Sequence, residues 1–200
     1  ADKYTPLKKL PYVYKQIIIG VLFGGVSAFA SSYGVEWLGA VVNVRDAAPL
    51  CAGLIFGGPA GVLSGIIGGV YRFFSVYWGG GTYTRLACTV STILAGIIAA
   101  VLRRFMFDNK RPTWSYGVFI TIVCEVLHML MIFFTNMKDS AYAFEFVKAA
   151  TLPMIIGNAV AVGLSLLVVF LINHGKRKYG KNKEHRPNPI VTMGLFMDAD

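Results

Sequence analysis

Apolar residues in this chain are gathered into blocks, and this feature restricts the possible folds more than any other. Several blocks run for about 20 residues, the length that an α-helix needs to cross the hydrocarbon core of a bilayer. Charged residues make up only 14% of the chain and hydrophobic residues 56%, whereas a soluble domain contains about 25% charged residues. Because the apolar residues form continuous runs and not one-sided stripes, we predict an all-α integral membrane protein folded as a compact helix bundle.

The apolar run at 37–74 is too long for a single crossing, since a helix rises about 1.5 Å per residue. Within it, Pro59 suits the first turn of a new helix, and Gly57 and Gly58 can supply the reversal before it. We therefore predict that the run divides into two helices here, which gives six crossings. The number falls to five if the Gly-Gly-Pro break is not a hairpin. The predicted helices are 15–33, 37–56, 59–74, 83–105, 114–135 and 148–173.

Basic residues are concentrated in three clusters that flank apolar blocks, which argues against a nucleic-acid partner despite the net charge of +9. Such clusters mark cytoplasmic segments under the positive-inside rule, and they favour contact with anionic membrane lipid. Six crossings place all three clusters on one side, whereas five would leave one basic terminus outside. The clusters are Lys3, Lys8, Lys9 and Lys15; Arg103, Arg104, Lys110 and Arg111; and Lys176, Arg177, Lys178, Lys181, Lys183 and Arg186.

Ionisable and amide side chains recur at membrane depth within these blocks. Such groups are costly in lipid and usually face the bundle interior or a watery cavity. We predict a polar site open to the outer side, and its arginines favour a small organic anion because guanidinium groups bind carboxylates in a bidentate geometry. The candidate ligand-binding residues are Asn43, Arg45, Asp46, Arg72, Arg85, Glu125, His128 and Asn158.

Purely structural roles stay open for several of these candidates. Arg45 and Asp46 can form an ion pair that only holds helices together. Arg72 and Arg85 lie near helix ends, where long basic side chains extend their charged groups to the membrane surface. Asn158 can supply a hydrogen bond between helices, worth about 1 kcal/mol or less.

Signals for catalysis, a metal or a cofactor are absent from the sequence. It contains no Gly-rich phosphate-binding loop, and His128 has no serine or cysteine nucleophile arranged around it. Cys124 and His128 are four residues apart, but two possible ligands do not make a metal site. We predict no catalytic residue, no metal and no cofactor.

The segment NVRDAAPLCAGLIFGGPAGVLSGIIGGVYRF, which begins at Asn43, resembles the signature of the LytS–YhcK-type multi-transmembrane receptor region. It has the Asn-x-Arg-Asp start, the Gly-Gly-Pro break and the Gly-rich sequence that ends in Tyr-Arg. The segments CEVLHM and PMIIGNAV resemble later parts of that family. The similarity covers 15–173, nearly the whole membrane part.

The resemblance implies a bacterial sensory input region that precedes a cytoplasmic output domain, such as a histidine kinase or a diguanylate cyclase. We then expect a cytoplasmic basic N-terminus at 1–14, a transmembrane sensory domain at 15–173 and a basic cytoplasmic linker toward a missing output domain at 174–200. The protein would lie in the bacterial inner membrane with both termini cytoplasmic, as a homodimer in the full-length receptor. The family is described with five crossings, against the six predicted above.

The leading functional hypothesis is a sensor in which a small extracellular solute binds between the outer halves of the helices. The alternative is the substrate-binding subunit of an energy-coupling-factor-type vitamin transporter. The small residues Gly20, Gly24 and Ala28 form a helix face that serves either packing inside the bundle or docking of another membrane protein. A third hypothesis is a membrane anchor without a ligand.

Overall fold

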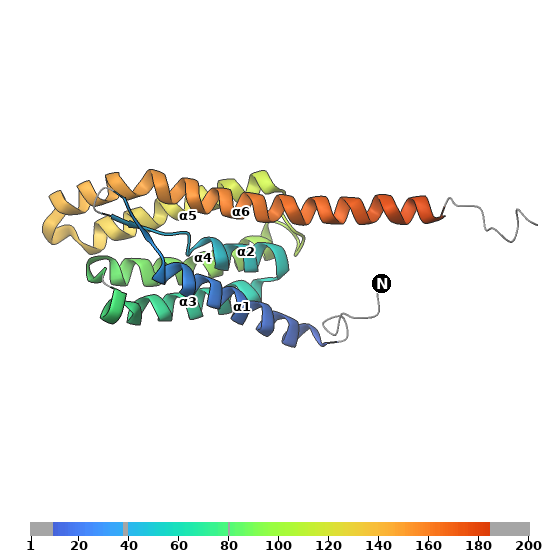
Figure 1. The fold of residues 1–200 in the computed structure, drawn as a ribbon, viewed down its shortest axis with the longest axis horizontal. Helices are drawn as coiled ribbons and strands as arrows, with labels where there is room; N and C mark the ends of the chain where they lie inside the picture. The colour runs from blue at the N-terminus through green and yellow to red at the C-terminus, as the bar shows by residue number, and fades with distance from the viewer. Residues whose placement is uncertain (1–9, 38–39, 80, 185–200) are drawn as a thin grey trace, which may run out of the picture. The chain divides into compact units, whose positions relative to one another are not determined.

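Six α-helices, three short helical segments of other types and one short β-hairpin make up the part of the chain that the computed structural model describes, residues 10–37, 40–79 and 81–184. The elements are α1 (Tyr12–Ser32), β1 (Val35–Trp37), β2 (Ala40–Val42), α2 (Ala47–Cys51), the π-helical η2 (Ala52–Phe56), α3 (Gly58–Gly79), η3 (Thr82–Thr84), α4 (Arg85–Phe105), α5 (Trp114–Thr135), η4 (Met137–Asp139) and α6 (Ser140–Glu184) (Figure 1).

The chain divides into two compact units, Ala1–Leu166 and Leu167–Asp200. The first unit contains α1 to α5 and the first part of α6, and all contacts discussed below lie within it. The second unit contains the remainder of α6, which is helical through Glu184. The predicted linker from residue 174 thus begins as a helix, and the last basic residue assigned to it, Arg186, lies outside the described residues. The proposed domain boundaries stay predictions.

Within the described residues, five helices are long and apolar enough to cross a membrane, which confirms the predicted all-α membrane bundle. A sixth apolar helix, Ala47–Phe56, is too short to cross by itself. The five long spans are Tyr12–Ser32, Gly58–Trp78, Thr82–Phe105, Trp114–Thr135 and Met137–Gly175.

The chain reverses at the predicted Gly-Gly-Pro break, between η2 and α3. Gly57 has φ 157°, a conformation that is nearly confined to glycine. The side chain of Gln16 on α1 joins the two sides of the break. Its Nε2 donates to the carbonyl of Phe56 at 3.1 Å, and its Oε1 accepts from the amide of Ala60 at 3.1 Å. A break in a membrane helix needs such partners, because lipid offers none to the freed backbone groups.

The helix before this break is shorter than predicted. We expected helix from residue 37, but β1 and β2 form an antiparallel pair in which Val35 opposes Val42, and helix begins only at Ala47. β-Branched residues favour strands over helices, and valines are frequent in this segment. The apolar run alone could not reveal this change of structure.

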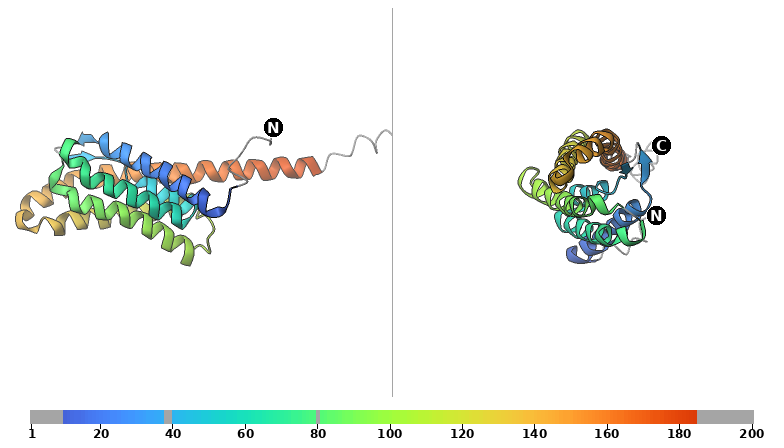
Figure 2. Two further views of the ribbon diagram at one scale, coloured as in Figure 1. Left: turned by 90° about the horizontal axis from the view of Figure 1, so that it is seen from below. Right: turned by 90° about the vertical axis from the view of Figure 1, so that its left-hand side faces the viewer.

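The first two long helices, α1 and α3, lie side by side and parallel (Figure 2). Gly20 of α1 faces Leu63 of α3, and one turn further Gly24 faces Ile67. Because two successive long helices can be parallel only if the chain returns between them, the hairpin and the short helix together bring the chain back between α1 and α3. The described part of the chain has five long spans, and the topology predicted from charge, with both termini on one side, stays a prediction.

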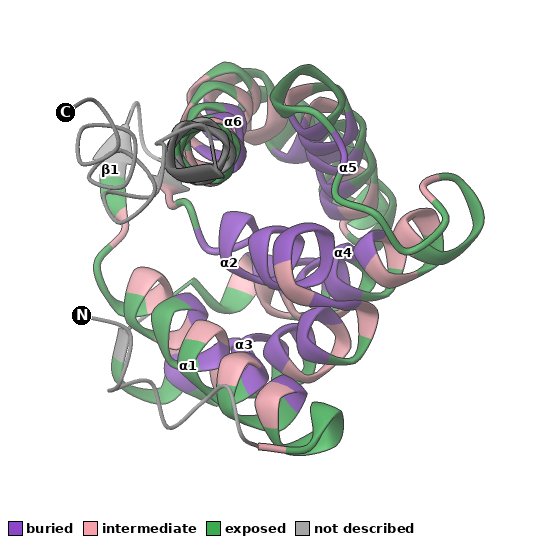
Figure 3. Cartoon of the chain, turned by 90° about the vertical axis from the view of Figure 1, so that its right-hand side faces the viewer, coloured by how far each residue is buried: buried purple, intermediate pink, exposed green. Residues whose placement is uncertain are grey.

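The short helix lies inside the bundle, and every residue from Arg45 to Ile55 is buried (Figure 3). It contacts α1, α3 and α4 along its length. At its C-terminal end, Arg103 donates to the carbonyl of Leu54 at 2.8 Å and Arg111 donates to that of Ile55 at 2.7 Å. Cations are favourable at this pole of a helix, so one arginine in the last turn of α4 and one after this helix satisfy the end of the buried helix.

Glycines allow the closest backbone contacts in the bundle. A methyl group placed on Gly61 of α3 would lie 2.6 Å from the Cα atom of Gly53 and 3.2 Å from the carbonyl oxygen of Gly96. The small-residue face on α1 is also used internally, since Gly20 and Gly24 pack on α3. For these two glycines, the open choice between internal packing and docking is therefore settled in favour of packing.

Replacing Gly61 with alanine is expected to lower the free energy of unfolding by about 1–3 kcal/mol, the usual cost of overpacking. Backbone atoms oppose the new methyl group, so no side chain can move aside. Gly25→Ala is the control, because a methyl group there meets nothing within 4 Å. Thermal melting of both variants in the same detergent checks the prediction, and equal melting temperatures would contradict it.

Candidate ligand site

Five buried polar residues meet where the short helix begins, and we call them the inner cluster: Arg45, Asp46, Thr92, Glu125 and His128. Each is at most 2% exposed. Arg45 and Asp46 directly precede α2, Thr92 lies on α4, and Glu125 and His128 lie one turn apart on α5. Three separate segments therefore converge on one point.

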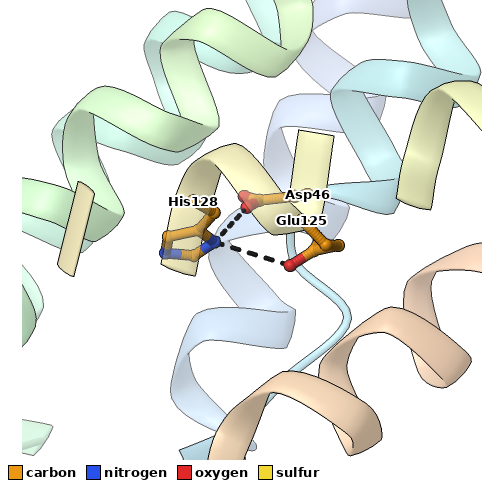
Figure 4. A group of neighbouring side chains, drawn as sticks. All are labelled: Asp46, Glu125 and His128. Atoms are coloured by element: carbon orange, nitrogen blue, oxygen red, sulfur yellow. Dashed lines mark ion pairs between the residues drawn. The ribbon is translucent and has the colours of Figure 1, made fainter. Parts of the chain in front are cut away.

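The carboxylate of Asp46 is the centre of the inner cluster. Its Oδ1 accepts a hydrogen bond from the hydroxyl of Thr92 at 2.6 Å and lies 3.5 Å from Nε of Arg45. Its Oδ2 lies 3.0 Å from Nδ1 of His128 (Figure 4). Two basic side chains thus share one carboxylate out of contact with solvent, where charges are screened least.

The guanidinium group of Arg45 is only partly satisfied by the protein. Its Nε donates to Oγ1 of Thr92 at 2.8 Å. Among the described residues, neither terminal nitrogen has a hydrogen-bond acceptor, although the thiol of Cys88 lies close by. Buried donors of this kind are rare without a partner, and an arginine whose two terminal nitrogens both lack an acceptor among the described residues can bind an added one.

Cys88 links this arginine to a second one. Arg72 of α3 also interacts with the thiol of Cys88, and Nε2 of His128 lies 3.4 Å from its sulfur. Three basic side chains therefore lie beside one small side chain at this point. Such a concentration of positive charge favours an anionic ligand.

Glu125 brings a second carboxylate to the inner cluster. Its Oε2 lies 3.6 Å from Nδ1 of His128, and neither oxygen makes a hydrogen bond within the described part of the chain. One atom each from Asp46, Glu125 and His128 fall within 4.8 Å of one another. One imidazole nitrogen and two carboxylate oxygens are a donor set able to hold a divalent cation, and the expected absence of a metal stays a prediction.

Asn158 and Asn43 fix the start of the short helix. The side chain of Asn158 on α6 accepts from the amide of Ala47 at 2.9 Å and donates to the carbonyl of Asn43 at 3.2 Å. The side chain of Asn43 accepts from the amide of Arg45 at 3.2 Å. Asn158 therefore makes the predicted contact between helices, and it also positions the residues that lead into the inner cluster.

The two remaining candidates, Arg72 and Arg85, lie in different surroundings. Arg72 donates to the carbonyl of Gly81 at 2.9 Å and to the hydroxyl of Thr84 at 3.2 Å, in addition to its interaction with Cys88. Arg85 is half-buried and lies over the ring of Phe73 at 4.7 Å from the centroid. Arg72 thus borders the inner cluster, whereas the role of Arg85 in ligand binding rests on the sequence alone.

Sequence reasoning missed Cys88 and Thr92. They lie four residues apart on α4 and therefore share a face, which is the face that meets Arg45 and His128. Small, weakly polar residues are common in membrane helices as packing contacts, so nothing in the sequence distinguishes these two from their neighbours.

Comparison with known proteins identifies the family. Residues 4–172 match the family model described as 5TMR of 5TMR-LYT. The chain is 29% identical over 164 residues to sensor histidine kinase YpdA of Escherichia coli, covering 82% of this chain and 28% of that protein. It is 33% identical over 130 residues to sensor histidine kinase/phosphatase LytS of Staphylococcus aureus, covering 64% of this chain and 21% of that protein.

The chain thus spans less than a third of the length of these curated relatives. No solved structure matches it. The family model extends over most of the chain, including all six predicted crossings except the last residue of 148–173. The chain belongs to the 5TMR of 5TMR-LYT family, the LytS-type sensor membrane region.

Proposed function

We propose that this chain is the sensory input region of a bacterial signalling receptor and that it detects a small extracellular organic anion. Its relatives are sensor histidine kinases, which supports an output through a cytoplasmic kinase; a diguanylate cyclase would serve the same role. No catalytic residue is proposed within the chain. The positive-inside rule supports cytoplasmic termini, and a homodimer is proposed for the complete receptor.

The observation that carries this proposal is the pair of buried arginines beside Cys88. Arg45 has two terminal nitrogens without an acceptor in the described residues, and Arg72 reaches the same thiol. A carboxylate ligand would supply the missing acceptors in a bidentate geometry, with charge-assisted hydrogen bonds. Asp46 already occupies the Nε side of Arg45, so the ligand would bind the opposite side of that guanidinium group.

Signalling requires that the anion bind one arrangement of the bundle better than another. The contacts suggest which elements would differ. Arg45 begins the short helix, and Asn158 connects the start of this helix to α6. A ligand that moves Arg45 would therefore act on α6, the helix that continues toward the C-terminus, where an output domain would follow.

A binding experiment tests the proposal. The chain is purified in lipid nanodiscs and melted in the presence of small mono- and dicarboxylates, with the matching primary amides as neutral controls. We expect at least one carboxylate to raise the melting temperature saturably while its amide does not, because a ligand that binds only the native state stabilises it. Equal effects of acids and amides, or no effect of any acid, would refute the proposed ligand class.

The transporter alternative receives no comparable support. It relied on Gly20, Gly24 and Ala28 as a docking face for a partner, and the two glycines pack against Leu63 and Ile67. The family match also points to sensor proteins. Solute uptake that depends on an ATPase partner would be evidence for the transporter hypothesis.

A further inference from the structure

A second polar feature lies at the opposite end of the bundle from the hairpin, around the Gly-Gly-Pro break. It is a groove of about 880 Å³ between α3 and α4. Its lining includes Gly58, Pro59 and Val62 of α3, Arg103 and Arg104 of α4, and Tyr12 of α1. The groove is separate from the inner cluster, none of whose residues line it.

The groove is suited to an anion. Two arginines border it, and none of the described residues that line it is acidic. Arg104 is exposed, and Arg103 uses one terminal nitrogen for the carbonyls of Gly53 and Leu54. The N-terminus of α3, a helix of 22 residues, opens into the same groove at Gly58. The positive end of the helix dipole adds to the field of the arginines.

The lining of the groove also contains apolar residues of α3, and they continue along an exposed side of this helix. Ile66 lines this groove and also a second, almost wholly apolar groove of about 590 Å³ that extends to Val70 and Phe74. Ile66, Val70 and Phe74 are 43–50% exposed. From Gly58 to Val70 the helix rises ~18 Å, which is close to the depth of one leaflet, roughly half of a 30 Å hydrocarbon core.

We propose that this pair of grooves binds an anionic phospholipid, with its phosphate between Arg103, Arg104 and the start of α3 and an acyl chain along Ile66 and Val70. A free phosphate ion would use only the first groove and would leave the apolar track empty. A zwitterionic lipid fits the track but adds a positive group where the arginines already lie. The continuity of the charged and apolar parts therefore favours an anionic lipid over both.

Lipid binding to the purified chain tests the site. Phosphatidylglycerol and phosphatidylcholine with identical acyl chains are titrated into detergent-solubilised protein, and bound lipid is counted by native mass spectrometry. We expect phosphatidylglycerol to bind more tightly. The Arg104→Gln variant should lose about fivefold in affinity for it, since one basic residue near an anionic lipid contributes about that factor.

Two further variants separate the site from general charge effects. Lys148→Gln removes one exposed positive charge from α6 near the opposite end and should bind phosphatidylglycerol as the unmodified chain does. Val62→Trp keeps both arginines but fills the groove, and it should lose binding. Equal affinity for the two lipids, equal losses in Arg104→Gln and Lys148→Gln, or undiminished binding by Val62→Trp would overturn the proposal. If glycerol phosphate displaces bound phosphatidylglycerol as effectively as the lipid itself does, the groove is a site for a free phosphate group and the proposal is overturned.

Discussion

Replacing Asp46 with asparagine is expected to lower the free energy of unfolding by about 3–5 kcal/mol, the cost of removing one partner from a buried ion pair. The carboxylate interacts with Arg45, Thr92 and His128 at once, and it is 2% exposed. An amide of the same shape can keep one hydrogen bond but leaves the positive charge of Arg45 without its nearest partner. Titration with sodium dodecyl sulfate in mixed micelles, followed by circular dichroism, measures this free energy.

A matched control and a second substitution make this result specific. Asp108→Asn changes the same functional groups at an exposed position with φ 48°, a conformation that asparagine tolerates, and it should change stability by less than about 0.5 kcal/mol. Adding Arg45→Met to Asp46→Asn should restore part of the loss, because the unpaired charge is then removed as well. Additive losses in the double variant would show that the two residues do not act as a pair.

The positions of the five long membrane helices could be predicted because each depends on a local signal. Apolar blocks locate the long helices, and the Gly57-Gly58-Pro59 break was confirmed by the reversal that Gln16 supports. The β-hairpin before the short helix could not be predicted in this way. Its residues are as apolar as those of a helix, and strand pairing within 35–42 depends on contacts between residues that hydropathy does not evaluate.

The candidate site was only partly predictable, for a related reason. Glu125 and His128 share a face through their spacing alone, and the structure confirms that they lie together. Their meeting with Asp46 depends on how α2 and α5 pack, which spacing within one helix does not reveal. The free-energy cost of placing a charged side chain in lipid correctly predicted that Arg45 and Asp46 lie in the interior of the bundle. The same argument could not tell Arg72, which turns toward Cys88, from Arg85, which turns toward Phe73.

A charged residue at membrane depth is therefore predicted to have an ion-pair or hydrogen-bond partner, but the sequence does not identify this partner. In the inner cluster the protein supplies the partners for Asp46, whereas the terminal nitrogens of Arg45 find no acceptor among the residues that the structure describes. This difference is visible only after the helices are packed. It is also the difference that separates an ion pair serving stability from an arginine available to a ligand.

The second large effect is expected from Arg72→Met, which should weaken binding of the responsive carboxylate about 10- to 100-fold. Hydrogen bonds to charged groups contribute about 1.5–3 kcal/mol, and methionine keeps an apolar stem of similar length while removing every donor. Isothermal titration in nanodiscs measures the change in affinity. The measurement is made well below the melting temperature of the variant, because Arg72 also holds the carbonyl of Gly81.

Two companion variants decide what a loss of affinity means. Lys148→Met removes an equal charge from an exposed ion pair, with 69% of the side chain accessible, and should bind as the unmodified chain does. Arg72→Lys keeps the charge but not the planar guanidinium group that matches a carboxylate. Its affinity for the carboxylate should therefore fall between that of Arg72→Met and that of Lys148→Met. If Arg72→Lys and Arg72→Met bind like the unmodified chain, the anion does not contact Arg72. If Lys148→Met loses as much affinity as Arg72→Met, the arginine acts only through the net charge of the protein and not through a site beside Cys88.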